Sequence, residues 1–128
     1  MVILDASAML AFLLEEPGQE PVAEAIATGA AAGTANLAEV MTVLTRGGMP
    51  AKEASEVITE LPIVRFDIDL DLALRAGAMI RITRPSGLSL GDRLCLALAA
   101  REGAPALTAD RAWLQVADAV GVKIDVIR

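Results

Sequence analysis

Short apolar runs of strand length alternate along this chain with longer segments of helical periodicity. The expected strands are residues 2–4, 63–66, 106–108 and 122–127, with a weak, short strand at 33–35. The expected helices are residues 8–15, 19–28, 36–45, 50–60, 69–82, 91–102 and 111–120. Because the two kinds of element alternate, the pattern predicts an α/β fold in which helices flank a mainly parallel sheet.

The strands differ in ways that predict their places in the sheet. Residues 63–66 and 122–127 carry charged side chains among apolar ones, whereas residues 2–4 and 106–107 are continuously apolar. A strand that is apolar on both faces must be covered on both, so the continuously apolar pair is expected at the centre and the other pair at the edges. A chain of 128 residues has room for one core, which makes residues 1–128 a single domain.

The composition excludes several classes of function. The chain has no histidine, which removes Ser/His/Asp triads, histidine acid–base pairs and histidine-based zinc sites. Aromatic residues make up only 2%, which disfavours a protein that binds nucleic acid by stacking bases. The single cysteine, Cys95, cannot form an internal disulfide, so a cytoplasmic protein is expected. No uncharged run reaches membrane-spanning length, so no membrane association is expected.

Four acids lie at or just after junctions between an apolar run and a helical pattern: Asp5, Glu39, Asp92 and Asp110. Asp5 is the most informative, because apolar residues surround it on both sides. In an open parallel sheet, ligands bind beyond the carboxyl ends of the strands. Asp5 and Asp110 fall at that edge, and the helices that contain Glu39 and Asp92 begin near it. The sequence therefore predicts one acidic cluster assembled from distant parts of the chain.

Such a cluster predicts a site for a hard cation. Oxygen donors without histidine or a thiol cluster suit Mg²⁺ or Mn²⁺ better than zinc. These ions take phosphate oxygens as further ligands and activate water, which points to phosphodiester hydrolysis. A net charge of −6 disfavours simple binding of a phosphate backbone and favours cation ligands or a basic partner. Ser7 and Thr108 are placed to orient a ligand at the same edge, although Thr108 also fits a simple capping role.

Each acid also has a structural interpretation. Asn36 with Glu39 and Ser89 with Asp92 both fit the spacing of a capping box, and Asp5 and Asp110 are suitable helix N-caps. The two interpretations coexist, because the dipole of a helix stabilises a carboxylate at its N-terminus. Capping would then help to keep clustered acids ionised and able to bind a cation.

The four acids lie in the segments VILDASA, NLAEV, LSLGDRLCLALA and LTADRAW, in that order. Together these segments resemble the acidic motifs of PIN-domain nucleases, and more narrowly those of VapC-type toxins from bacterial toxin–antitoxin pairs. The resemblance implies a three-layer α/β/α sandwich with sheet order 3-2-1-4-5 and Mg²⁺- or Mn²⁺-dependent endoribonuclease activity. It also implies that Asp5, Glu39, Asp92 and Asp110 are the catalytic metal-site acids. The family often has a further acid shortly after the last motif, where this chain has Trp113, with Asp118 further along.

The same resemblance implies RNA as the substrate and a cognate antitoxin as the partner. Because the chain is acidic and rich in apolar helices, we expect the antitoxin to present a basic amphipathic segment. We also expect the free toxin to form a homodimer through apolar helical surfaces.

Other residues allow two interpretations each. Arg93 and Arg111 stand beside predicted site acids, where they are either phosphate contacts or exposed helix-start arginines. Trp113 is either a base-stacking residue or, as we favour, core packing. Three further arginines either guide the substrate along the surface or form an ordinary solvated helical face. They are Arg75, Arg81 and Arg84.

Three other function classes fit less well. A phosphoacceptor receiver domain needs paired acids after its first strand and a lysine near its last, but Asp5 stands alone and Lys123 lies within the terminal strand. An aspartyl phosphatase needs a second acid where Ser7 stands. A catalytically inert α/β interaction module has no need of all four acids.

Overall fold

The computed structural model describes residues 1–128 and contains one parallel sheet of five strands in the order β3-β2-β1-β4-β5. The strands are β1 (Val2–Leu4), β2 (Ala30–Gly33), β3 (Val64–Phe66), β4 (Ala106–Thr108) and β5 (Ile124–Val126). The apolar strands β1 and β4 are neighbours near the centre, whereas β3 and β5 form the edges. Both the expected order and the division into central and edge strands are confirmed.

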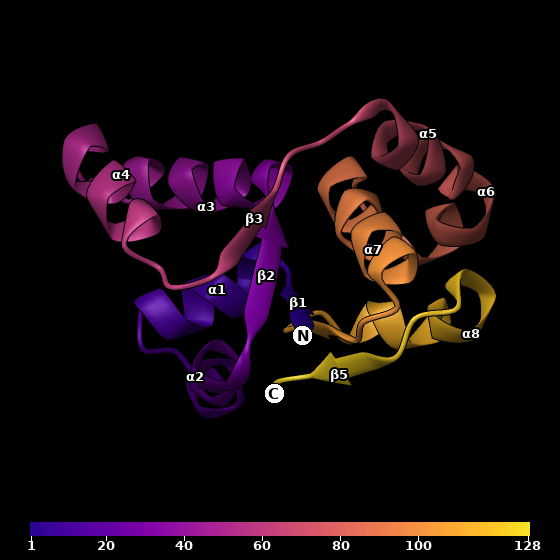
Figure 1. Cartoon of the computed structure of the whole chain (residues 1–128), viewed down its shortest axis with the longest axis horizontal. Helices are drawn as coiled ribbons and strands as arrows, with labels where there is room; N and C mark the ends of the chain where they lie inside the picture. The colour runs from indigo at the N-terminus through magenta and orange to yellow at the C-terminus, as the bar shows by residue number, and fades with distance from the viewer.

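Helices cover both faces of the sheet, which gives the expected three-layer α/β/α sandwich (Figure 1). In Figure 1, α1 to α4 lie to the left of the sheet and α5 to α8 to the right. The α-helices are α1 (Ala6–Leu13), α2 (Gln19–Thr28), α3 (Thr34–Arg46), α4 (Ala51–Thr59), α5 (Leu70–Ala78), α6 (Ile80–Thr83), α7 (Leu90–Glu102) and α8 (Ala117–Val120). Two short 3-10 helices, η1 (Arg84–Ser86) and η2 (Arg111–Gln115), complete the chain.

The alternation of side chains along the central strands divides the core into two parts. Ile3 and Ala106 pack with residues of α5 and α7, whereas the next residues along the strands, Leu4 and Leu107, pack with residues of α1 to α4. Successive side chains of a strand point to opposite faces, so each central strand contributes to both clusters. This double burial explains why β1 and β4 are apolar throughout.

The expected positions of two early elements were wrong by a few residues. The second strand occupies residues 30–33, because Gly29, with φ of 127°, ends α2 and lets the alanine run enter the sheet directly. The first helix begins at Ala6, because Asp5 caps it. It ends at Leu13, and Glu15 beyond it has a φ of 53°, which is not helical. Local turn geometry, which periodicity does not specify, therefore fixed these boundaries.

Two expected helices are interrupted. Residues 69–82 divide into α5 and α6 at Met79, whose N–H bonds to the carbonyl of Ala76 in a tighter, 3-10-type turn. Residues 111–120 form η2 followed by α8, with the fully buried Trp113 inside the 3-10 part. No helix of the structure is both long and apolar enough to span a membrane.

Candidate metal centre

The sheet topology brings the predicted site acids to its carboxyl edge. Asp5 follows β1 directly, and Asp110 lies two residues after β4, which is hydrogen-bonded to β1 with Leu4 opposite Leu107. Glu39 belongs to α3, which begins where β2 ends, and Asp92 lies in the first turn of α7. Helices α3 and α7 pack against each other, so four elements deliver one acid each to the same end of the molecule.

Asp5 is almost completely buried, with 4% of its surface exposed, and accepts hydrogen bonds through both carboxylate oxygens. The backbone N–H of Ala8 donates to Oδ1 at 2.8 Å, which is the N-cap bond of α1 predicted from the sequence. The Ser7 hydroxyl lies 2.7 Å from Oδ1 and 2.9 Å from Oδ2, and Thr108 donates to Oδ2 at 2.6 Å. Asp5 is therefore both a helix cap and a rotationally fixed carboxylate.

Ser7 and Thr108 also connect Asp5 to the segment that carries Asp110. The N–H of Ala109 donates to the Ser7 hydroxyl at 2.8 Å, and the N–H of Asp110 donates to the Thr108 hydroxyl at 3.0 Å. Asp110 itself is exposed and accepts a bond from the N–H of Ala112, which makes it the predicted N-cap, here of η2. The two hydroxyls thus act as a bridge between two predicted site acids.

Asp92 forms the capping box expected for α7. The N–H of Asp92 donates to the Ser89 hydroxyl at 3.2 Å, and the N–H of Ser89 donates to Asp92 Oδ2 at 2.9 Å. The side chain remains half-buried, with Oδ1 outside this pair of bonds. Capping therefore fixes one oxygen of Asp92 and leaves the other for a ligand.

The capping box expected at Asn36 and Glu39 was wrong. Gly33 is the N-cap of α3, so Asn36 lies inside the helix and cannot cap it. Its side-chain amide instead donates to Glu39 Oε1 at 3.1 Å and to the carbonyl of Gly91, on α7, at 3.2 Å. The Asn36-to-Glu39 spacing signalled a shared helix face, but the second contact depends on a residue 55 positions away.

Burial and mutual repulsion make three of the acids weaker than usual. Burial raises the pKa of Asp5 to about 6, against which the bonds from Thr108, Ala8 and Ser7 act, while the charge of Asp92 adds to the rise. Burial also raises the pKa of Glu39, and the charges of Asp92 and Asp5 raise it further. The pKa of Asp92 rises through burial and, to a smaller extent, the charge of Asp110. These mutual effects show that the four carboxylates influence one another.

The residues fit a divalent cation by donor chemistry. All four candidate ligands offer carboxylate oxygens, which Mg²⁺ and Mn²⁺ prefer, and a cation would relieve the repulsion that adds to the effect of burial on three of the pKa values. No three of these side chains are close enough in this structure to enclose an ion.

The other predicted contacts have different surroundings. Arg93 donates through Nη1 to the carbonyl of Ala76 at 3.1 Å, which turns it toward α5. Arg111 is exposed and donates through Nη1 to the carbonyl of Arg128, and Arg75 pairs with Asp71 along the exposed face of α5. Trp113 is fully buried in the core, as favoured from the sequence. Arg81 and Arg84 are exposed and form no ion pair in the structure.

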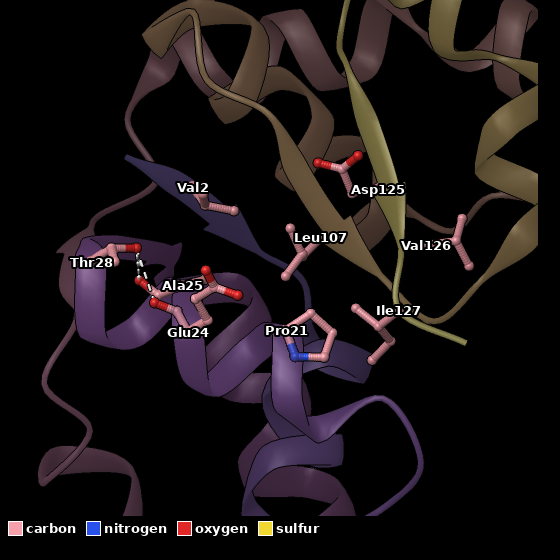
Figure 2. A pocket seen from close by; sticks show the side chains of 9 residues that line it. All are labelled: Val2, Pro21, Glu24, Ala25, Thr28, Leu107, Asp125, Val126 and Ile127. Atoms are coloured by element: carbon pink, nitrogen blue, oxygen red, sulfur yellow. Dashed lines mark hydrogen bonds between the residues drawn. The ribbon is translucent and has the colours of Figure 1, made fainter.

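A separate groove of about 310 Å³ lies between α2 and β5 (Figure 2). Its lining is mainly apolar, with Leu107 and Ile127 among its residues, and it also includes Glu24 and Asp125. None of the four predicted site acids lines this groove. The groove is therefore distinct from the candidate metal centre, which is an open edge of the sheet.

Comparisons with known proteins agree with this architecture. The sequence matches the model of the PIN domain over residues 2–119. No curated protein matches the sequence. A chain of the DNA-bound VapBC complex from Salmonella typhimurium superposes with a TM-score of 0.76 at 14% identity, over 99% of this chain and 98% of the other.

Two further solved structures share the fold. VapC20 from Mycobacterium tuberculosis, described as a toxin that cleaves the sarcin–ricin loop, has a TM-score of 0.71 at 17% identity, over 87% of this chain and 91% of its own. FitAcB from Neisseria gonorrhoeae superposes with a TM-score of 0.68 at 16% identity, over 99% of this chain and 98% of its own. At such low identities these matches establish the common fold.

Proposed function

The chain belongs to the PIN-domain family, and from this premise we propose that it is a Mg²⁺- or Mn²⁺-dependent endoribonuclease, the cytoplasmic toxin of a toxin–antitoxin pair. One observation supports this proposal above the others. Four carboxylates from four separate elements lie at the carboxyl edge of the sheet, and burial, with a smaller contribution from mutual repulsion, raises the pKa values of Asp5, Glu39 and Asp92. Such an arrangement costs free energy unless a cation binds to it.

The proposal gives each residue a role. Asp5, Glu39, Asp92 and Asp110 hold the cation. When bound, the cation supplies positive charge to the transition state of phosphodiester hydrolysis and makes water acidic enough to supply hydroxide. Asp5 needs no reorganisation, because Ser7 and Thr108 already fix both of its oxygens. Preorganised ligands of this kind reduce the entropy lost on binding.

The charge of the chain is consistent with metal-assisted binding of RNA. At a net charge of −6 the protein as a whole repels a polyanion, so the cation must provide the main attraction for the scissile phosphate. Arg81 and Arg84 are the best additional phosphate contacts, since both are exposed without an ion pair and lie just before the turn that leads to Asp92.

The toxin part of the proposal draws on the similar structures. A solved structure from Klebsiella pneumoniae that shares the fold is a toxin–antitoxin complex, and the one from Salmonella typhimurium is a DNA-bound VapBC complex. By analogy, this chain binds an antitoxin, and its acidity favours a basic amphipathic segment. Leu70 and Leu74, one turn apart on α5 and 73% and 65% exposed, provide an apolar surface for homodimer formation.

An RNA cleavage assay tests the catalytic proposal. Purified protein should cut RNA internally in Mg²⁺ and stop when EDTA removes the metal. Asp5→Asn and Asp92→Asn should be inactive while retaining helical circular dichroism, whereas Asp118→Asn, a change of an exposed acid on α8, should keep full activity. Cleavage in EDTA, or full activity of Asp5→Asn, would contradict the proposal. A folded wild type that never cuts RNA would point to an inert interaction module.

Co-expression tests the partner. The product of the neighbouring reading frame should copurify with this chain and suppress cleavage even in excess Mg²⁺. If the neighbour fails to bind, or binds and leaves cleavage unchanged, the toxin–antitoxin assignment fails while the nuclease assignment stands.

A further inference from the structure

Asn36 joins two helices through a single buried amide. Only 1% of its surface is exposed, and its Nδ2 donates both to Glu39 Oε1 on α3 and to the backbone carbonyl of Gly91 on α7. The carboxylate of Glu39 is thereby tied to the first turn of the helix that carries Asp92. The contact with Gly91 belongs to no helix cap, because α3 is capped at Gly33.

The surroundings of Asn36 fix the direction of its amide. Both neighbours of Nδ2, a carboxylate oxygen and a backbone carbonyl, are acceptors, so the reversed amide would place Oδ1 against two acceptors. In the observed direction, Oδ1 is buried without any hydrogen-bond partner. A buried acceptor without a donor destabilises the fold, and an apolar side chain of the same shape would avoid that cost.

Gly91 leaves the space that the Glu39 carboxylate fills. A β-carbon at position 91 would overlap Glu39 Oε1 and lie 2.6 Å from Cδ. Gly91 has no positive φ that would itself demand glycine, because it lies in the regular first turn of α7. Gly91 therefore provides the space for the Glu39 carboxylate, and the Asn36 amide donates a hydrogen bond to it.

We propose, building on the function proposed above, that Asn36 is a positioning residue that holds the Glu39 carboxylate against Gly91, in the orientation from which it binds the cation. An amide suits this task because it donates without carrying charge. A lysine or arginine would neutralise Glu39 and compete with the metal, whereas an apolar residue would leave the carboxylate free to rotate into solvent. The unpaired Oδ1 is the structural cost of placing a neutral donor there.

The first test needs neither metal nor activity. Asn36 is the sole asparagine of the chain, so ¹⁵N-asparagine labelling yields a single pair of side-chain amide signals, one for each Nδ2 proton. In the metal-free protein, both Nδ2 protons should exchange with water at least roughly tenfold more slowly than in the unfolded chain. Glu39→Ala should release one of the two protons. Rapid exchange of both protons in the wild type would overturn the proposal, as would an unchanged signal in Glu39→Ala.

The second test measures Mg²⁺ affinity by calorimetry. Asn36→Leu, which keeps the number and branching of the side-chain heavy atoms and removes the unpaired Oδ1, should fold and weaken Mg²⁺ binding by roughly tenfold, as the loss of a residue that orients a ligand does. In a Glu39→Gln background the same change should have no further effect, because the two residues act as one unit. Thr42→Val, an exposed change on the same helix, is the control and should leave affinity unaltered.

The outcomes separate this proposal from the function itself. If Asn36→Leu binds Mg²⁺ as tightly as the wild type, the positioning role is wrong and the nuclease proposal stands. If the wild type neither binds Mg²⁺ nor cuts RNA, the proposed function fails. The labelled amide then still decides whether Asn36 holds Glu39, since that measurement is made without metal.

Discussion

Thr108 donates a 2.6 Å hydrogen bond to Oδ2 of Asp5, although 103 positions separate the two residues in the chain. Both side chains are buried, and the contact exists because β1 and β4 are parallel neighbours whose ends lie level. The Thr108 hydroxyl also accepts the N–H of Asp110. One hydroxyl therefore connects the most buried acid of the cluster to the most exposed one.

Thr108→Val tests this bridge with almost no change in shape. The substitution leaves a buried carboxylate short of a donor, so the free energy of unfolding at pH 7 should fall by about 1–3 kcal/mol. Urea denaturation measures the loss, which should be smaller at pH 4.5, where Asp5 is mostly protonated. Thr42→Val, whose hydroxyl is exposed, should stay within about 0.5 kcal/mol of the wild type. Equal effects of the two substitutions would show that the bridge contributes nothing.

Asp5 should make the metal-free protein less stable as pH rises. Its folded pKa of about 6 lies above the usual 3.8, so between these values the folded state holds a proton that the unfolded state has released. The contribution of Asp5 is therefore present in full below pH 3.8 and is lost as pH rises to about 6, a change of about 3 kcal/mol. Glu39 and Asp92 act in the same direction, since their pKa values are also raised.

Asp5→Asn removes that contribution. In EDTA, its unfolding free energy should fall less steeply than that of the wild type between pH 4 and pH 6, as measured by urea titrations at each pH. If the variant loses stability as steeply as the wild type over this range, Asp5 is not destabilised by burial.

Gly91→Ala should separate folding from metal binding. Alanine favours a helix interior over glycine by about 1 kcal/mol, but its β-carbon displaces the Glu39 carboxylate. The metal-free thermal midpoint should therefore stay equal or change little, while Mg²⁺ affinity measured by calorimetry falls. Gly77→Ala on α5 is the matched control, because nothing lies within 4 Å of a β-carbon there. It should stabilise the protein and leave Mg²⁺ binding intact, and a comparable loss of affinity in both variants would refute the explanation.

Millimolar Mg²⁺ or Mn²⁺ should raise the thermal midpoint of the wild type. A ligand that binds only the folded state stabilises it by mass action, by about 2.7 kcal/mol at one hundred times its dissociation constant. Differential scanning fluorimetry should show a smaller rise for Glu39→Gln and Asp92→Asn. If those variants respond as the wild type does, the ion binds elsewhere on the protein.

The exposed leucines of α5 should control self-association. Leu74→Glu, at a position that is 65% exposed, places a charge on the proposed dimer surface without disturbing the core. Light scattering after size-exclusion chromatography should show a homodimer for the wild type and a monomer for the variant. Leu114→Glu, on η2 and 48% exposed, is the control and should remain dimeric. A wild-type monomer would remove homodimer formation from the proposed function.

Much of this protein follows from its sequence. The alternation of apolar runs and helical patterns predicted a mainly parallel sheet flanked by helices, and the charged residues of β3 and β5 predicted the edges of the sheet. Capping of α7 by Ser89 and of α1 by Asp5 could also be predicted, because a cap involves only residues two or three positions apart. The motifs predicted which acids form the site, and the topology of the chain brings the elements that carry them to one edge of the sheet.

Tertiary structure alone decided what those acids contact. Thr108 reaches Asp5 because two strands lie side by side in register, and Asn36 reaches Gly91 because α3 packs on α7. Helical spacing specified that Asn36 and Glu39 share a face, but the same spacing fits a capping box, which made the local prediction wrong. The periodicity of a sequence predicts only which face of a helix or strand a residue occupies. The neighbour on that face is set by strand order and helix packing, which bring together residues that are distant in the chain.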